Sequence, residues 1–437
     1  MLSADVVVVG SGFAGLVAAL EAATAGASVL VVEKMRAAGG NSILSDGGFA
    51  ALGQGDSTEL FYQDLLRAGQ GLNRPLLART LVESAEEALQ WSKEFLGVQY
   101  LDRLEVFGGH SVARGFTAKG RSGSSLLRPL LSKLDELGVP IRFGAKLERL
   151  ETDASGRVVG VSVLDGYDHR DPTAGTLQTL LARKAVVLAT GGFGADVAFR
   201  LRHDPRLTAD VATTNKPFAT AEALVEAMRL GAAAVDLEHI QLGPWASPDE
   251  RGYGEAPGFA DYTVFPLGIV VDPATGRRFC NEMADRKTLA DALLAVGHPC
   301  LGLADAAAVA KSGWSLDRGL KKGVIGRFAT LEALADAHGA PREALAQTAA
   351  HSGKFGVGPY YGVRLWPKVH YTMGGLAVGP DGAVLDAAGG PLAGLFAAGE
   401  VTGGLHGACR LGSCSITECF VFGRIAGRTA AAQETRV

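Results

Sequence analysis

Runs of apolar residues separated by glycine turns dominate both ends of the chain. Residues 4–9 (ADVVVV) are almost entirely apolar and do not alternate with polar residues, which predicts a parallel strand buried on both faces. A glycine turn follows, and the small apolar residues over 13–25 predict a packed helix that ends at Gly26. A second apolar run over 27–32 (ASVLVV) predicts another buried strand. The three segments together predict a β–α–β unit of the expected length.

The same patterning predicts further elements. Helical spacing of apolar residues occurs over 76–96 and 126–137, and a last helix is expected over 415–432. Strands are expected over 139–150 and over 182–192, where ARKAVVLATGG is a buried run that ends in two glycines.

The pattern changes between residues 238 and 368, where proline, aromatic residues and polar loops are more frequent. Short strands such as GGLAV and GLFAAGE return after residue 370. A chain of 437 residues is too long for one small core. We therefore predict one domain made from residues 1–237 and 369–437, which carries the nucleotide-binding elements, and a second domain, residues 238–368, inserted between its two parts.

Charge and composition exclude several classes of function. A net charge of −4 favours neither nucleic acid nor an anionic membrane as a partner. The apolar amino terminus lacks a basic leader and no run of about 20 apolar residues occurs, so we expect neither a signal peptide nor a membrane span. The five cysteines form no CxxC pair, which argues against a zinc knuckle or attached haem and indicates a reducing compartment. We expect no metal site and a cytoplasmic location.

A glycine motif follows the first predicted strand. Gly10, Gly12 and Gly15 form GxGxxG, which is informative because it stands between a strand and a helix. Gly10 permits a tight turn, Gly12 lets the backbone approach a pyrophosphate, and Gly15 lets the helix pack on the strand. Ser11 and Ala14 lie within the motif, where the amino terminus of the helix offers free N–H groups to phosphates.

The loop after the second strand distinguishes FAD from NAD. Glu33 ends that strand, where its carboxylate can accept hydrogen bonds from a ribose. Residues 39–42 (GGNS) follow at once, as they do in flavin enzymes, where the cofactor extends along this loop. Glu400, after a strand in the tail, is placed to bind a ribityl hydroxyl. We therefore predict FAD. Further cofactor contacts are expected at Lys34, Gly40, Asn41, Ser42, Gly47, Gly48, Thr190, Gly191, Glu222, Ser415 and Ile416.

Several segments carry a family resemblance. They are VVVVGSGFAGLVAAL, EKMRAAGGNS, SDGGFAA, VVLATGGF, GRRFCNEMADR, HYTMGG and GEVTGGLHGACRLGS, in this order along the chain. Together they resemble the fumarate reductase/succinate dehydrogenase flavoprotein family, and most closely its soluble branch of flavocytochrome fumarate reductases and urocanate reductases, without a haem domain. The resemblance implies an α/β fold: a Rossmann-like FAD-binding domain of the glutathione-reductase type with an inserted α+β capping domain. Members with covalent flavin carry a histidine in the loop corresponding to residues 41–49. No histidine occurs there, so we expect noncovalent FAD.

The resemblance also assigns roles to three charged residues. Arg410 and His370 correspond to residues that hold a substrate carboxylate, and Arg286, in NEMADR, corresponds to the proton donor. The implied reaction is reduction of a C=C bond conjugated to the carboxylate. Hydride passes from flavin N5 to the β-carbon, and Arg286 gives a proton to the α-carbon. A structural ion pair of Arg286 with Glu282 or Asp285 is the alternative interpretation.

One departure from the fumarate reductase pattern bears on the substrate. Gly243 stands where those enzymes carry a second histidine, so the far end of the substrate lacks an ionic partner. Phe49 and Trp245 are candidates to stack on a flat ring, with packing in the core as an equal alternative. Thr372 and Gly375 are further candidate substrate contacts. These features favour a urocanate-like or arylacrylate-like monocarboxylate over fumarate.

Two other functions are consistent with the sequence. The same site run backwards is a dehydrogenase or desaturase of a saturated acid or a ketosteroid-like substrate, although an arginine donor favours reduction. A flavoprotein subunit that only relays electrons needs no anion clamp, so Arg410 and His370 argue against it. We expect a small carboxylate as substrate and an external electron donor, which is a reductase, a quinone or reduced flavin.

Overall fold

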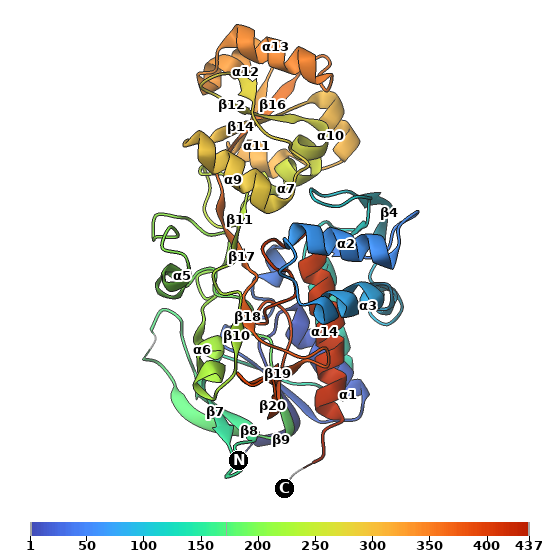
Figure 1. Cartoon of the computed structure of the whole chain (residues 1–437), viewed down its shortest axis with the longest axis vertical. Coiled ribbons are helices and arrows are strands. Elements are labelled where there is room, and N and C mark those ends of the chain that lie inside the picture. The colour runs from blue at the N-terminus through green and yellow to red at the C-terminus, as the bar shows by residue number, and fades with distance from the viewer. Residues whose placement is uncertain (1, 172, 436–437) are drawn as a thin grey trace.

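The computed structural model describes residues 2–171 and 173–435 (Figure 1). Its largest sheet has the strand order β19-β20-β9-β1-β2-β6, and β8 joins it on β9 and β7 on β8. The central pairs are parallel, whereas β8 and β19 run antiparallel to their neighbours. The bounds are β1 (Leu2–Val9), β2 (Val29–Glu33), β6 (Ile141–Phe143), β7 (Ala145–Thr152), β8 (Val158–Asp165), β9 (Thr176–Leu188), β19 (Ala383–Leu385) and β20 (Pro391–Ala397).

The first β–α–β unit is formed as its apolar pattern predicts. Val6 and Val9 of β1 pair with both β2 and β9, and the strand is buried because helices cover the sheet. The expected strand over 139–150 is wrong in one respect, because it is two strands, β6 and β7. Gly144 separates them with φ +66°, a left-handed conformation that interrupts an extended chain.

Helices from the two ends of the chain pack side by side (Figure 1). They are α1 (Phe13–Thr24) and α14 (Cys414–Ala431). Their axes approach closely because α14 presents glycine at the contact: a Cβ on Gly427 would lie 2.3 Å from the carbonyl oxygen of Ala18. The tail of the chain is therefore part of the same core as the first strand.

The remaining elements of this part surround the sheet. The helices are α2 (Thr58–Ala68), α3 (Pro75–Glu94), α4 (Ser124–Glu136), α5 (Val197–His203), α6 (Glu222–Arg229) and the 3₁₀ turn η1 (Ser42–Leu44). A small antiparallel sheet has the order β3-β5-β4, with β3 (Gly48–Ala50), β4 (Tyr100–Glu105) and β5 (Gly115–Ala118). A two-stranded sheet pairs β10 (Ala234–Val235) with β18 (Gly375–Leu376).

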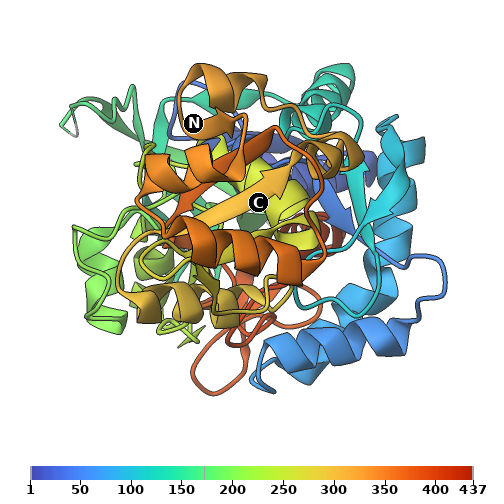
Figure 2. The same ribbon diagram turned by 90° about the horizontal axis from the view of Figure 1, so that it is seen from above.

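The inserted part forms the upper lobe in Figure 1 and lies in front in Figure 2. It is built on an antiparallel sheet of order β13-β12-β14-β16-β15. Its strands are β12 (Ile269–Asp272), β13 (Arg277–Arg278), β14 (Cys300–Asp305), β15 (Ile325–Phe328) and β16 (Tyr360–Leu365). Its helices are α7 (Ala256–Phe259), the π-helical turn η2 (Ala260–Val264), α8 (Phe265–Leu267), α9 (Arg286–Val296), α10 (Ala306–Ser312), α11 (Asp317–Lys321), α12 (Leu331–His338) and α13 (Arg342–Ser352).

The two lobes have separate hydrophobic cores. The inserted lobe packs its own clusters from residues between 245 and 365, apart from the core around the large sheet. The two segments that connect the lobes lie side by side, since β11 (Ile240–Gly243) pairs antiparallel with β17 (Lys368–Thr372). These features support a division at residues 238 and 368, which stays a prediction. Every helix in the described part of the chain is too short or too polar to pass through a bilayer.

Candidate active site

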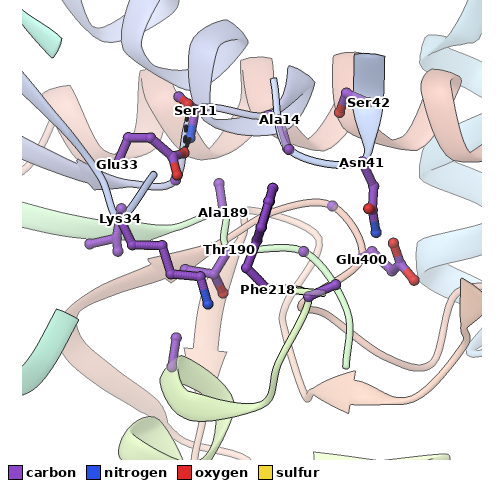
Figure 3. A pocket seen from close by; sticks show the side chains of 18 of the residues that line it. Ser11, Ala14, Glu33, Lys34, Asn41, Ser42, Ala189, Thr190, Phe218 and Glu400 are labelled. Atoms are coloured by element: carbon purple, nitrogen blue, oxygen red, sulfur yellow. Dashed lines mark hydrogen bonds between the residues drawn. The ribbon is translucent and has the colours of Figure 1, made fainter. Parts of the chain in front are cut away.

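A cavity opens at the carboxyl ends of β1 and β2, where α1 begins (Figure 3). The turn before α1 is tight: Gly10 has φ +105°, and a Cβ there would lie 2.3 Å from the carbonyl oxygen of Ala189. A Cβ on Gly15 would lie 2.0 Å from the carbonyl oxygen of Gly10, so Gly15 allows the helix to pack on this turn. Gly12 is the N-cap of α1 and has no side chain to cap it, and Phe13 N, the first N–H of the helix, donates to Ser42 Oγ at 3.1 Å. The amino-terminal residues Gly12, Phe13 and Ala14 line the cavity.

Glu33 points from the end of β2 toward the glycine turn (Figure 3). Its Oε2 accepts hydrogen bonds from Ser11 N at 3.1 Å and from Ser11 Oγ at 2.6 Å, and its Oε1 accepts from Met35 N at 2.8 Å. With 7% of its surface exposed, the carboxylate is fixed rather than mobile. It therefore presents a preformed acceptor at one end of the cavity.

A second charged pair lies at the rim. Lys34 Nζ is 3.0 Å from Glu222 Oε2 and also donates to Thr220 Oγ1 at 2.9 Å. Burial raises the pKa of Glu222, but the charge of Lys34 outweighs this effect and holds the pKa below its usual value. Phe218 also lines the cavity, and no motif in the sequence pointed to it.

Most of the predicted cofactor contacts line this cavity. They are Gly10, Ser11, Gly12, Ala14, Glu33, Lys34, Gly40, Asn41, Ser42, Thr190, Gly191, Glu222 and Glu400. Gly48, Ser415 and Ile416 line a second cavity instead, and Gly15 and Gly47 line neither. The two cavities adjoin, because Phe13, Asn41, Ser42, Glu400 and Cys419 belong to both.

Arg410 reaches the second cavity from the irregular segment between β20 and α14. The residue is 2% exposed, and no carboxylate of the described residues pairs with it. Its Nη1 donates to Leu411 O at 2.8 Å, its guanidinium lies 4.4 Å from the centre of the Tyr371 ring, and its Nε is buried without a partner. Burial and the charge of Arg286 lower the pKa of Arg410. A buried cation of this kind calls for an anionic ligand.

His370 belongs to β17 and lies next to Arg410. Its Nε2 is 3.1 Å from Arg410 Nη2, and its Nδ1 is 2.9 Å from the hydroxyl of Thr214. The ring of Trp245 meets His370 edge to face at 4.5 Å. Withdrawal from water, with further repulsion from Arg410 and Arg286, puts the pKa of His370 well below its usual value. The imidazole is therefore neutral near pH 7.

Arg286 enters the same cavity from the inserted lobe. It is the first residue of α9, and Asp285 caps that helix by accepting from Thr288 N at 3.0 Å. The alternative interpretation, an ion pair with Glu282 or Asp285, does not hold, because Glu282 pairs with Arg278 and Asp285 accepts from Thr288. The partner is Asp261 of η2, whose Oδ2 lies 3.2 Å from Arg286 Nη2.

Asp261 has a perturbed proton affinity. Burial raises its pKa to about 6, although the attraction of Arg286 opposes the rise. Sequence patterning gave no signal for this residue, because it lies 25 positions from Arg286 and outside any motif. Tyr253 and Phe107, which also line the cavity, were missed for the same reason.

Four of the predicted substrate contacts do not line the cavity. Phe49 is fully buried on β3 and packs against Phe420 at 5.4 Å, so the alternative of core packing holds for it. Thr372 and Gly375 are buried, and Thr372 N donates to Glu400 at 3.0 Å. Gly243 is covered by Trp245, since a Cβ on Gly243 would lie 2.8 Å from Trp245 Cη2. Trp245 itself lines the cavity.

Comparisons with known proteins identify the family of this chain. Residues 5–416 match the family described as FAD binding domain. The acrylate reductase flavoprotein subunit of Shewanella woodyi is 42% identical over 97% of this chain and 90% of its own length. The urocanate reductase of Eggerthella lenta is 32% identical over 98% of this chain and 74% of its own length. The chain belongs to the fumarate reductase/succinate dehydrogenase flavoprotein family.

A solved member of this flavoprotein family has the same fold. The open form of a flavocytochrome c3 fumarate reductase is 32% identical, with a TM-score of 0.78 over 98% of this chain and 78% of that chain. The flavoprotein described here is accordingly an FAD-dependent oxidoreductase acting on CH–CH groups, and the prediction of FAD is confirmed. The first cavity fits the cofactor, because it combines the amino-terminal end of α1 with the fixed carboxylate of Glu33.

Proposed function

We propose that this flavoprotein reduces the C=C bond of an α,β-unsaturated monocarboxylate. The observation that carries the proposal is Arg410, a cation with 2% exposure and no carboxylate partner among the described residues. Its Nε is buried without a partner, and the residue lines the same cavity as His370 and Arg286. A substrate carboxylate supplies the missing charge and accepts from the guanidinium. A subunit that only relays electrons needs no such site.

The four charged or titratable side chains divide the chemistry between them. Arg410 and His370 bind the carboxylate and stabilise the negative charge that develops on it. Arg286 holds a proton for the α-carbon, and its attachment to the rigid start of α9 fixes the direction of delivery. Because a guanidinium gives up a proton reluctantly, Arg286 needs immediate reprotonation. Asp261, at 3.2 Å and with a pKa of about 6, is the proton source that the geometry supports.

FAD supplies the hydride in this reaction. We propose that it is held without a covalent bond, since the loop of residues 41–49 contains no histidine. Glu33 and the start of α1 would hold its ribose and phosphates, and Glu400 its ribityl chain. We also propose an external electron donor. The five cysteines are all free thiols, which supports a cytoplasmic location for this chemistry.

Trp245 bears on the choice of acid. Its ring fills the space above Gly243, where a second anion-binding side chain would have to begin. This arrangement favours a monocarboxylate over a dicarboxylate. Phe49 lies in the core, so one of the two expected stacking partners for a flat substrate is absent. We therefore propose a small acid of the acrylate type, with a urocanate-like or arylacrylate-like acid as the alternative.

A screen under anaerobic conditions tests the proposal. The FAD-loaded enzyme is reduced chemically and mixed with acrylate, urocanate, cinnamate or fumarate while flavin absorbance is followed. We expect fast re-oxidation by a monocarboxylate and slow re-oxidation by fumarate. Re-oxidation by fumarate alone contradicts the monocarboxylate assignment. If none of the acids re-oxidises the flavin, the enzyme does not reduce 2-enoic acids.

A further inference from the structure

Thr214 contacts the nitrogen of His370 that faces away from Arg410. The Thr214 hydroxyl oxygen is 2.9 Å from His370 Nδ1, and the residue is 2% exposed. Sequence patterning did not single it out. A hydroxyl can donate and accept a hydrogen bond, whereas Arg410, on the other side of the ring, can only donate. This difference decides where the imidazole proton resides.

Without a substrate the protonation state of His370 follows from its two neighbours. Arg410 Nη2 donates to His370 Nε2 at 3.1 Å, so Nε2 must be an unprotonated acceptor. A neutral imidazole then carries its proton on Nδ1 and donates it to the Thr214 hydroxyl. The hydroxyl hydrogen of Thr214 turns to the carbonyl oxygen of Val369, 3.3 Å away.

A bound carboxylate demands the opposite arrangement. Carboxylate oxygens only accept hydrogen bonds, so His370 can hold one only if Nε2 carries a proton. One route is a second proton on the ring, which gives an imidazolium ion. The groups that face the ring oppose this: Arg410 and Arg286 are cations, and the rings of Trp245 and Tyr253 offer no negative charge. Three carboxylates line this cavity, and each already has a partner: Asp261 pairs with Arg286, Glu400 accepts from Thr372 N, and Asp46 accepts from the Tyr262 hydroxyl.

The other route keeps the ring neutral and moves the proton. We propose that Thr214 is a positioning residue that sets the tautomer of His370: its hydroxyl accepts from Nδ1 in the free enzyme and donates to Nδ1 when a carboxylate is bound. The imidazole proton passes from Nδ1 to Nε2 by exchange with water, and the number of bound protons does not change. The proposal rests on the proposed function, because it requires a carboxylate beside His370.

Turning the hydroxyl costs little, because Val369 keeps its other donors. Its carbonyl oxygen also accepts from Thr214 N at 2.8 Å and from Thr213 Oγ1 at 3.0 Å. The longer bond from the Thr214 hydroxyl is therefore dispensable, and no buried acceptor is left without a partner when it breaks. The hydroxyl has two good partners and can change between them.

Calorimetry with the FAD-loaded enzyme tests the proposal. Propionate, the saturated counterpart of acrylate, is titrated in two buffers with different ionisation enthalpies, and the difference gives the protons taken up on binding. We expect no proton uptake by the wild type or by Thr214→Ser. Thr214→Val keeps the shape but cannot donate, so we expect about one proton to be taken up, or binding weakened at least tenfold.

The outcomes separate this proposal from the proposed function. Proton uptake by the wild type, or wild-type binding by Thr214→Val without proton uptake, refutes the tautomer change alone. If propionate does not bind to the wild type at all, the carboxylate site itself is refuted and this proposal with it. Flavin absorbance and thermal unfolding of each variant show that it is folded and loaded with FAD. The pH profile gives a second readout: we expect kcat/KM of Thr214→Val to fall more steeply with rising pH than that of the wild type, since only the imidazolium form of the variant binds the carboxylate.

Discussion

Replacing Asp261 with Asn tests how Arg286 recovers its proton. The two side chains lie 3.2 Å apart and are 14% and 13% exposed, so water does not readily replace Asp261. Asn has the same size and accepts a hydrogen bond from Arg286, but it cannot carry a proton between solvent and the guanidinium. The change therefore removes the relay and leaves the shape of the cavity.

The expected loss of turnover follows from the usual contribution of a positioned acid or base, about 10²–10⁴-fold. The direction of the pH dependence follows from the raised pKa of Asp261, about 6. The protonated form that feeds Arg286 predominates below this value. Wild-type turnover should therefore fall as pH rises through about 6, and the Asp261→Asn variant should show a low rate without this step.

Stability should decline over the same pH range. Burial raises the Asp261 pKa from 3.8 to about 6, and two pKa units correspond to about 3 kcal/mol. The stabilisation is fully present below the lower value and is lost as pH rises through the higher one. The free energy of unfolding of Asp261→Asn should lack this decline, which urea unfolding of the FAD-loaded protein at several pH values measures.

The kinetic assay is anaerobic re-oxidation of the reduced enzyme by its best 2-enoic acid. It is followed from about pH 5 to about pH 9, which includes the Asp261 pKa of about 6 and neutral pH. The matched control is Asp291→Asn. Asp291 is also near Arg286 in sequence, on α9, but it forms an exposed pair with Lys287. This control should behave like the wild type. If Asp261→Asn keeps the wild-type rate and pH profile, Asp261 is not the proton source.

Three further changes follow from the same geometry. Arg410→Lys should weaken binding of a competing carboxylate about 100-fold, because an ammonium cannot make the two parallel hydrogen bonds of a guanidinium. The control is Arg428→Lys on α14, where the side chain is 47% exposed. Equal affinity of the two variants for the carboxylate contradicts the assignment of Arg410. Trp245→Ala should raise kcat/KM for cinnamate relative to acrylate about tenfold, and an unchanged ratio of the two argues against a steric limit. Gly427→Val should lower the free energy of unfolding in urea by about 3 kcal/mol, because a Cβ there would lie 2.3 Å from the carbonyl oxygen of Ala18. If the variant is as stable as the wild type, α1 and α14 can separate without cost.

Much of the fold follows from local patterning. The apolar run of β1 and the glycine turn after it gave the cofactor site, because each residue there acts through its own backbone. Arg410, His370 and Arg286 were placed by motifs, and the structure brings them to one cavity. The roles of the three side chains stay predictions that the experiments above address.

Other parts of the site could not be read from the sequence. Asp261 belongs to a π-helical turn of the inserted lobe, and its pairing with Arg286 depends on how that lobe folds. Thr214 meets His370 across 156 positions through the pairing of distant segments. Phe49 was open to two interpretations, stacking on the substrate or packing in the core. Its ring packs against Phe420 of α14, a neighbour that is distant in sequence and that local patterning does not reveal.

The contact of α1 with α14 has a consequence for synthesis on the ribosome. The first strand and helix are made early, but α14, which packs against α1, is translated only after the inserted lobe. The inserted lobe closes its own cores from one continuous stretch, residues 245–365, and has no such delay. The inserted lobe should therefore fold first, and the nucleotide-binding half should stay exposed to chaperones until α14 has been made.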